Sequence, residues 1–226
     1  MTTTLFSHRR VAAGVAGLAA VGAMAFAGAG AANAAPATTV TSGHTDIVSV
    51  SCSASGVLTV DTYREADGHI APGDIGDWPF LFDDLDSPVA AISYASNTWT
   101  VSGGEQYEDE IPFIGFQYAS AGSAAFCPSS VSFDVSKSTT GTNTGDAVFT
   151  ANDAANGSTS SAAGDTNKVT LYRPGSGLGA SHEHGQWTFN GPSSGGDYTL
   201  RFETFRGTST TPIATVIDPV HIHVQP

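Results

Sequence analysis

Short apolar segments alternate with clusters of Gly, Ser, Thr, Asn and Pro along most of the chain, and this rhythm constrains the fold more than any other feature. In 198–203, Tyr198, Leu200 and Phe202 share one face and polar residues share the other, as in a half-buried strand. No long stretch keeps apolar residues at helical spacing behind a capping residue. We therefore predict an all-β fold, a single antiparallel β-sandwich of Ig-like or jelly-roll-like type with long irregular loops. Further short strands are expected at 56–63, 98–101, 131–135, 147–149 and 169–172.

Two stretches depart from this rhythm. Residues 64–88 are rich in Asp and in aromatic side chains, so we expect a long loop that lays its aromatics against the edge of the sandwich. Residues 137–167 are almost all small or polar, which predicts a flexible surface excursion around one short strand at Phe149.

The N-terminus has the three parts of a secretory signal. A positive segment, His-Arg-Arg at 8–10, precedes an uncharged run of mostly Ala, Gly and Val, and Ala-Asn-Ala at 32–34 closes the run with a small-x-small cleavage site. An N-terminal membrane anchor is the alternative, but the run is only weakly hydrophobic. We predict a signal peptide over 1–34 and a secreted domain over 35–226, with no membrane span after cleavage.

The secreted domain is strongly acidic. Removing Arg9 and Arg10 from the eight basic residues leaves six against 21 acidic ones, a formal charge of −15. Such a surface repels nucleic acid and anionic lipid and attracts cations, so we expect no nucleic-acid partner. The C-terminal sequence VIDPVHIHVQP carries neither a sorting signal nor a hydrophobic tail, so we expect an extracellular, released protein, with cell-wall association as the alternative.

Cys52 and Cys127 are the only cysteines of the chain. Two cysteines in an exported protein predict one disulfide, because the compartment is oxidising. Free thiols or a thiolate metal site are the alternatives, and an oxidising compartment argues against both. Any metal chemistry then falls to histidine and carboxylate.

Four of the histidines form two His-x-His pairs, His182 with His184 and His221 with His223. Residues i and i+2 of a strand point to the same face, and neighbouring strands lie about 4.8 Å apart, so two such strands side by side would bring four imidazoles to one ion. Both pairs have the parity opposite to the apolar residues of their own strands, and therefore face away from the core. Ordinary surface histidines are the alternative.

His44 is the fifth candidate ligand, in the sequence Gly-His-Thr-Asp at 43–46. Val48 and Val50 have the same parity as His44, so a β-bulge or a strand-end position is needed to turn His44 outward. Neutral imidazole is the usual ligand of Zn(II) and Cu(II), so we predict a metal site that draws on His44, His182, His184, His221 and His223. We expect His69, in an acidic loop, to be an ordinary surface residue.

Several motifs carry a family resemblance. The sequence from His182 to Phe189, followed by Gly-x-Tyr-x-Leu at 196–200, resembles the H-x-H-x-x-W-x-F…G-x-Y-x-L signature of the actinobacterial surface-anchored repeat proteins, also called choice-of-anchor M domain proteins. Gly-His-Thr-Asp-Ile at 43–47, Gly-Val-Leu at 56–58 and Gly-Asp-Ala-Val-Phe at 145–149 are similar to other parts of that family. The resemblance covers about 43–204.

The resemblance implies a secreted or wall-attached β-sandwich. Members of the family often accompany transporters similar to zinc and manganese importers, which makes metal capture the expected activity. His44, His182 and His184 match the histidines of the family, whereas His221 and His223 lie outside its pattern.

Our leading hypothesis from the sequence is a secreted module that captures or buffers Zn(II) or Cu(II), with a cell-surface metal transporter or a cell-wall component as partner. The alternative is a non-catalytic adhesion or glycan-binding module, in which Trp78, Phe80 and Trp99 would be exposed aromatics. A metal-dependent hydrolase with Asp46 or Glu183 as general base is a third hypothesis. We expect no enzyme, since the sequence contains no Ser-His-Asp motif, no H-E-x-x-H and no phosphate-binding loop.

Overall fold

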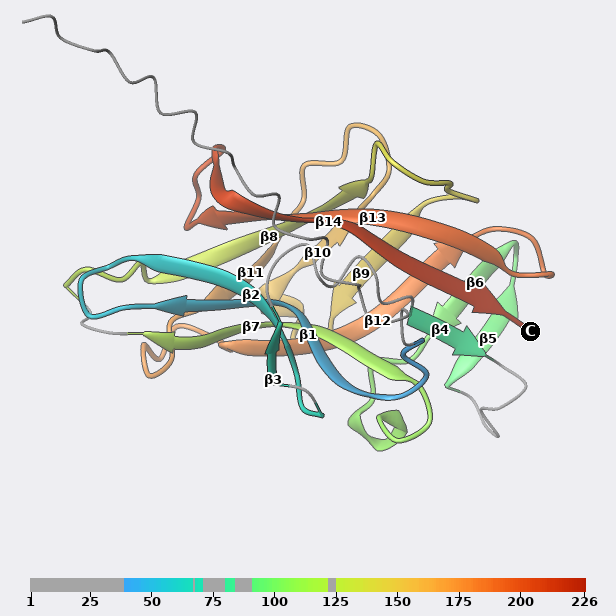
Figure 1. Ribbon diagram of the computed structural model, residues 1–226, viewed down its shortest axis with the longest axis horizontal. Coiled ribbons are helices and arrows are strands. Elements are labelled where there is room, and N and C mark those ends of the chain that lie inside the picture. The colour runs from blue at the N-terminus through green and yellow to red at the C-terminus, as the bar shows by residue number, and fades with distance from the viewer. Residues whose placement is uncertain (1–38, 67, 71–79, 84–90, 122–124) are drawn as a thin grey trace, which may run out of the picture. The chain divides into compact units, whose positions relative to one another are not determined.

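The computed structural model describes residues 39–66, 68–70, 80–83, 91–121 and 125–226, and these form two packed β-sheets (Figure 1). The predicted signal peptide at 1–34 lies outside the described residues. The strands of the two sheets enclose one core, as expected for elements that each bury one face. The prediction of an all-β sandwich is confirmed.

The larger sheet has nine strands. Seven follow one another in the spatial order β10-β9-β12-β7-β1-β2-β3, while β6 pairs with β12 and β5 pairs with β6. These strands are β1 (Gly43–Cys52), β2 (Leu58–Arg64), β3 (Gly68–Ile70), β5 (Ile92–Ala95), β6 (Thr98–Val101), β7 (Pro112–Ala121), β9 (Ala147–Ala151), β10 (Ser158–Ser160) and β12 (His182–Asn190).

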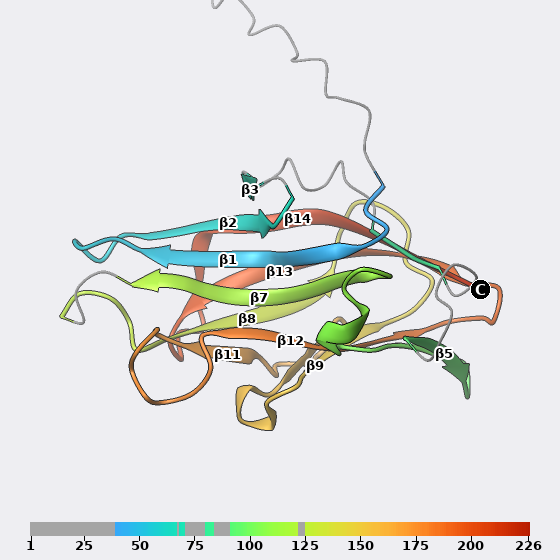
Figure 2. The same cartoon turned by 90° about the horizontal axis from the view of Figure 1, so that it is seen from below.

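The smaller sheet has five strands in the order β11-β8-β13-β14-β4. They are β4 (Phe80–Asp83), β8 (Ser130–Lys137), β11 (Val169–Tyr172), β13 (Gly196–Arg206) and β14 (Pro212–Gln225). Two short 3₁₀ turns, η2 (Glu105–Tyr107) and η3 (Ala154–Asn156), lie in connections of the larger sheet. Figure 2 shows β1 and β7 side by side in the larger sheet, with β8, β13 and β14 in the layer behind.

Each strand expected from alternation is present, but two of the pairings are parallel. Strand β1 runs parallel to β7, and β14 runs parallel to β4. The two sheets are therefore mixed, whereas we predicted an antiparallel sandwich. Parallel neighbours need long connections, and the chain between each of these two pairs is long enough to cross from one edge to another.

Aromatic side chains from both sheets fill the core. Phe116 of β7 lies 5.1 Å from Phe133 of β8 and 5.9 Å from Phe202 of β13, measured between ring centroids across the sandwich. Trp187 and Phe189 of β12 are also buried. The parity expected for β12 is thus correct, and it sends His182 and His184 to the outer face of the larger sheet.

The described parts of the two stretches that break the rhythm contain strands that we did not expect, β4 and β10. Phe80 lies in β4 and is fully buried, and Trp99 is 2% exposed, so neither aromatic forms the exposed surface that an adhesion module would need. Trp78 lies outside the described residues. In 137–167, β9 and β10 pair with each other and extend the larger sheet, because Thr159 and its neighbours hydrogen-bond inward despite their polar composition.

Cys52 and Cys127 form the predicted disulfide, with Cα atoms 6.0 Å apart. It links the end of β1 to the segment before β8. Among the described residues, no helix has the length and apolar character needed to cross a membrane.

Candidate metal centre

The candidate site lies on three adjacent strands of the larger sheet, β1, β7 and β12. Asp46 of β1 and His184 of β12 are both in register with Gly115 of the central strand β7. His44 lies opposite Phe113 in the same way, and His182 lies opposite Gln117. Side chains of i and i+2 residues on the two outer strands therefore project over one short stretch of β7.

A β-bulge at Ile47 turns His44 and Asp46 outward. The register with β7 shifts between Asp46 and Val48, which inserts one extra residue into β1. Because side-chain direction has a period of two, one inserted residue reverses the faces. His44 and Asp46 thus point to the outer face while Val48 and Val50, of the same parity, are fully buried in the core. Of the two arrangements that the sequence left open, a bulge or a strand-end position, the structure contains the bulge.

Strand β7 supplies the floor of the site with three residues of one face. Phe113 stacks on the ring of His184, with centroids 3.9 Å apart and planes within 3°. Gln117 donates a hydrogen bond from its side-chain amide to Asp46 Oδ2. At Gly115 an added Cβ would lie 2.6 Å from His184 Nδ1, so only glycine leaves room for this imidazole.

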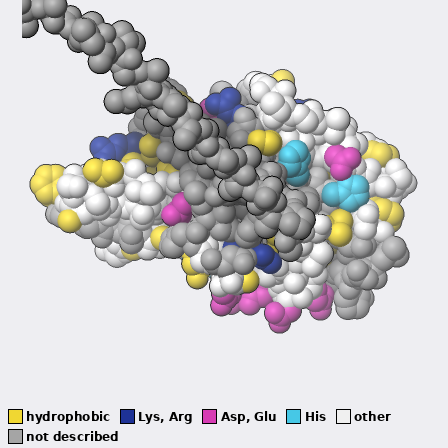
Figure 3. Space-filling view, in the orientation of Figure 1, with side chains coloured by type: hydrophobic (Ala, Val, Ile, Leu, Met, Phe, Trp, Pro, Cys, Tyr) yellow, Lys and Arg dark blue, Asp and Glu magenta, His cyan; other side chains and the backbone are white. Residues whose placement is uncertain are grey.

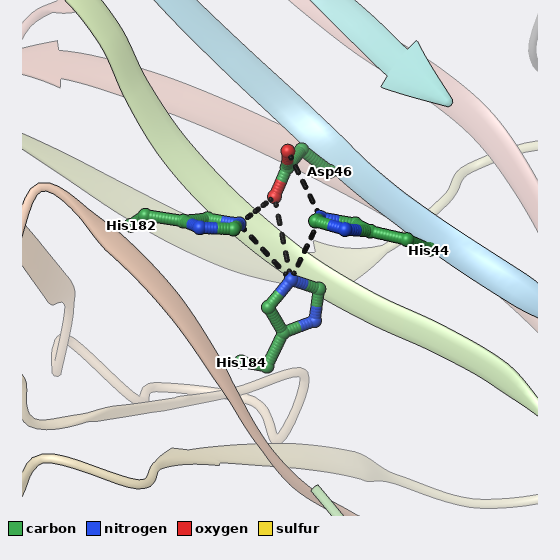
Figure 4. A group of neighbouring side chains, drawn as sticks. All are labelled: His44, Asp46, His182 and His184. Carbon is green, nitrogen blue, oxygen red and sulfur yellow. Dashed lines mark hydrogen bonds and ion pairs between the residues drawn. The ribbon is translucent and has the colours of Figure 1, made fainter. Parts of the chain in front are cut away.

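Four donor atoms converge above this floor (Figure 4). His184 Nε2 lies 3.1 Å from His44 Nε2 and 3.0 Å from His182 Nε2. Asp46 Oδ1 lies 2.8 Å from His182 Nε2 and 3.6 Å from His184 Nε2, and Asp46 Oδ2 lies 3.4 Å from His44 Nε2. One donor atom from each of the four residues lies within 4.8 Å of all the others.

These spacings match a tetrahedral metal site. Zn–N and Zn–O bonds of about 2.0–2.2 Å place the corners of a tetrahedron about 3.3–3.6 Å apart. The five donor–donor distances given above run from 2.8 to 3.6 Å and so span this spacing. A square-planar site needs two diagonals of about 4 Å, and none of these five distances is that long. Three imidazoles and one carboxylate are also a donor set that Zn(II) uses.

The charge states of Asp46 and His184 suit cation binding. Burial raises the pKa of Asp46, but hydrogen bonds to His182 and His44 outweigh this and hold the pKa at about 2, so the carboxylate stays ionised. Burial lowers the pKa of His184 to about 3, which keeps its imidazole neutral with a free lone pair. The hydrogen bond to Asp46 is the main cause that raises the pKa of His44.

The site is partly open to solvent. The side chain of Asp46 is fully buried and that of His184 is 7% exposed, whereas that of His182 is 44% exposed. A pocket of about 250 Å³ leads to the imidazoles, and Glu105 and Glu108 of the segment around η2 line it. Two further carboxylates thus stand on the approach to the site and attract cations.

Glu183, between the two histidines of β12, faces the opposite side. It is 6% exposed and accepts hydrogen bonds from Asp153 N (3.0 Å) and Asn156 Nδ2 (2.7 Å). Its role is to hold the loop around η3 against β12. Glu183 is therefore not positioned to act as the general base of a metal centre. Asp46, the other candidate base, is itself one of the four grouped donor residues.

His221 and His223 do not join this group. Both lie on β14, which belongs to the smaller sheet, while β12 belongs to the larger one. The expectation that two His-x-His strands lie side by side is therefore wrong, because β14 pairs with β13 and β4. Asp46, rather than His221 or His223, completes the group with His44, His182 and His184.

Sequence reasoning found His44, His182 and His184 but missed the rest of the site. The i, i+2 spacing of His44 and Asp46 was the signal for the fourth donor. No sequence signal identifies Phe113, Gly115 and Gln117, since their relation to the histidines depends on which strand lies between β1 and β12.

Comparisons with known proteins add little. No family model matches the chain, and no curated protein matches it. The chain is similar to a solved structure described as the N-terminal domain of PorA, with 12% identity and a TM-score of 0.32, over 70% of this chain and 91% of that one. A similarity of this degree carries no inference about fold or function.

Proposed function

We propose that the domain binds one transition-metal cation through His44, Asp46, His182 and His184, and that it serves outside the cytoplasm as a module that captures or buffers Zn(II) or Cu(II). The convergence of four donor atoms at tetrahedral spacing carries the proposal. This spacing favours Zn(II) over Cu(II), which prefers square-planar or tetragonal sites.

The number of ligands supports binding rather than catalysis. Catalytic zinc sites keep a position open for water or substrate, whereas four protein donors fill a tetrahedral shell. The export signal in the sequence and the resemblance to surface-anchored repeat proteins support an extracellular location, and a cell-surface metal transporter or a cell-wall component as the recipient of the ion.

Calorimetric titration of chelator-treated protein with Zn(II) tests the proposal. We expect one high-affinity ion per chain. A His182→Ala, His184→Ala double variant should lose at least about 100-fold in affinity, since even outer residues around metal ligands are worth 10- to 100-fold. The His221→Ala, His223→Ala variant is the matched control and should keep the high-affinity ion.

A second readout reports geometry. Co(II) in a tetrahedral site of nitrogen and oxygen donors gives an intense visible absorption that an octahedral aquo ion lacks. We expect this band in the wild type and in the control variant. Absence of saturable Zn(II) binding in the wild type, or equal affinity in the His182→Ala, His184→Ala variant, would refute the proposed function.

A further inference from the structure

The two histidines that the first site leaves out share a pocket on the other sheet. His221 and His223 lie on the outer face of β14, since Val220, Ile222 and Val224 are buried in the core. They line a pocket of about 280 Å³, together with Asp197 of β13 and the Gly141–Thr142 segment. In Figure 3, two histidine side chains lie close together beside an acidic one on the face that β14 crosses in Figure 1.

Asp197 orients one of these imidazoles. It pairs with His223 in the β13–β14 register, and its Oδ1 lies 2.7 Å from His223 Nδ1. A carboxylate that accepts the Nδ1 proton of a histidine fixes the tautomer and leaves the Nε2 lone pair free, which is the usual arrangement behind a metal-bound histidine. His223 is thus prepared to donate Nε2.

His221 supplies the second donor. It stands opposite Thr199 in the register, and within the described part of the chain neither of its ring nitrogens makes a hydrogen bond. The first site shows what the same spacing can do, since the two histidines of β12, also i and i+2 on one strand face, bring their Nε2 atoms to 3.0 Å. Residues i and i+2 of a strand lie on one face about 6–7 Å apart, so rotation of both imidazoles toward each other would place two nitrogens around one ion.

We propose that His221 and His223 form a second, independent site for a divalent transition-metal cation, with Asp197 as the positioning residue. Two protein donors leave the remaining coordination positions to water, so this site is open where the first is filled. We expect the order of affinity to follow the intrinsic order of the ions, with Cu(II) bound most tightly. This second site goes beyond the proposed function, because it uses none of the residues of the first metal site.

Copper titration of the full chain tests the second site. Cu(II) is the probe, the stoichiometry is read by calorimetry, and nitrogen couplings in the electron paramagnetic resonance spectrum identify the donors. We expect two ions per wild-type chain and one in the His221→Gln, His223→Gln variant, with loss of the two-nitrogen signal. The reciprocal His182→Ala, His184→Ala variant is the control and should lose the first ion while keeping the second ion and its two-nitrogen signal.

The variant Asp197→Asn tests the positioning role. It should weaken the second copper ion by about 10- to 100-fold, the range found for such outer partners, without changing the affinity of the first or the melting temperature of the metal-free protein. One ion in both the wild type and the His221→Gln, His223→Gln variant would overturn the second site and leave the proposed function intact. One ion in the wild type and none in that variant would overturn the proposed function instead.

Discussion

Replacing Gly115 by alanine should dismantle the first metal site without touching any of its donors. The added Cβ would lie 2.6 Å from His184 Nδ1 and 2.7 Å from His184 Cε1, where ordinary contact begins near 3.4 Å. The imidazole must therefore retreat by about 0.8 Å, whereas metal–ligand distances vary by only about 0.2 Å. The stacked contact with Phe113 would have to break as well. We expect Zn(II) affinity to fall by about 100-fold, equivalent to about 2.7 kcal/mol.

Calorimetry with Zn(II) and the visible spectrum of the Co(II) form measure this loss. The new Cβ also lies 2.5 Å from the carbonyl oxygen of Glu183, so a general loss of stability must be separated from the effect on His184. A double-mutant cycle does so: in metal-free protein, Gly115→Ala should cost at least about 1 kcal/mol less when His184 is already alanine. Zinc affinity within threefold of the wild type, or costs that add within about 0.5 kcal/mol, would refute the steric reasoning.

Three further predictions concern stability. In chelator-treated protein, burial holds the pKa of His184 at about 3, below the 6.5 of an unperturbed histidine, so on acidification the unfolded chain takes up the proton first. Protonation of this residue in the unfolded chain therefore removes about 2 kcal/mol from the free energy of unfolding between pH 7 and pH 5. Urea titrations should show a flatter pH dependence of stability for His184→Gln than for the wild type, and parallel curves would contradict this. The Cys52→Ser, Cys127→Ser variant lacks the disulfide that joins residues 75 positions apart, and its free energy of unfolding in denaturant should be roughly 4 kcal/mol lower. A loss under about 1 kcal/mol would argue against a chain-entropy origin of the stabilisation. Glu183→Ala leaves the backbone amide of Asp153 and the side-chain amide of Asn156 without their acceptor. The free energy of unfolding should fall by about 2–4 kcal/mol, while one high-affinity Zn(II) is still bound. An unchanged unfolding midpoint would show that water replaces the carboxylate.

Local patterns in the sequence predicted the strands well because alternation reports directly which face of a strand is buried. Tyr198, Leu200 and Phe202 are all at most 1% exposed, as their spacing requires. The same logic predicted the outward direction of the His-x-His pairs and the need for a bulge after His44. In the described parts of the two stretches without clear alternation, the sequence did not predict β4 and β10, because these strands gain their order from neighbouring strands rather than from their own residues.

By itself, the sequence determined the all-β class, the disulfide and the three histidines that meet in the first site. These follow from the period-two alternation, the two cysteines and the parity of each strand, all of which are properties of neighbouring residues. Only the tertiary structure decided that β7 separates β1 from β12, that Gly115 leaves room for His184, and that Asp46 rather than His221 or His223 is the fourth donor. Strand order depends on how distant segments pair, and several pairings bury the same apolar faces, so the pattern within each strand does not select among them.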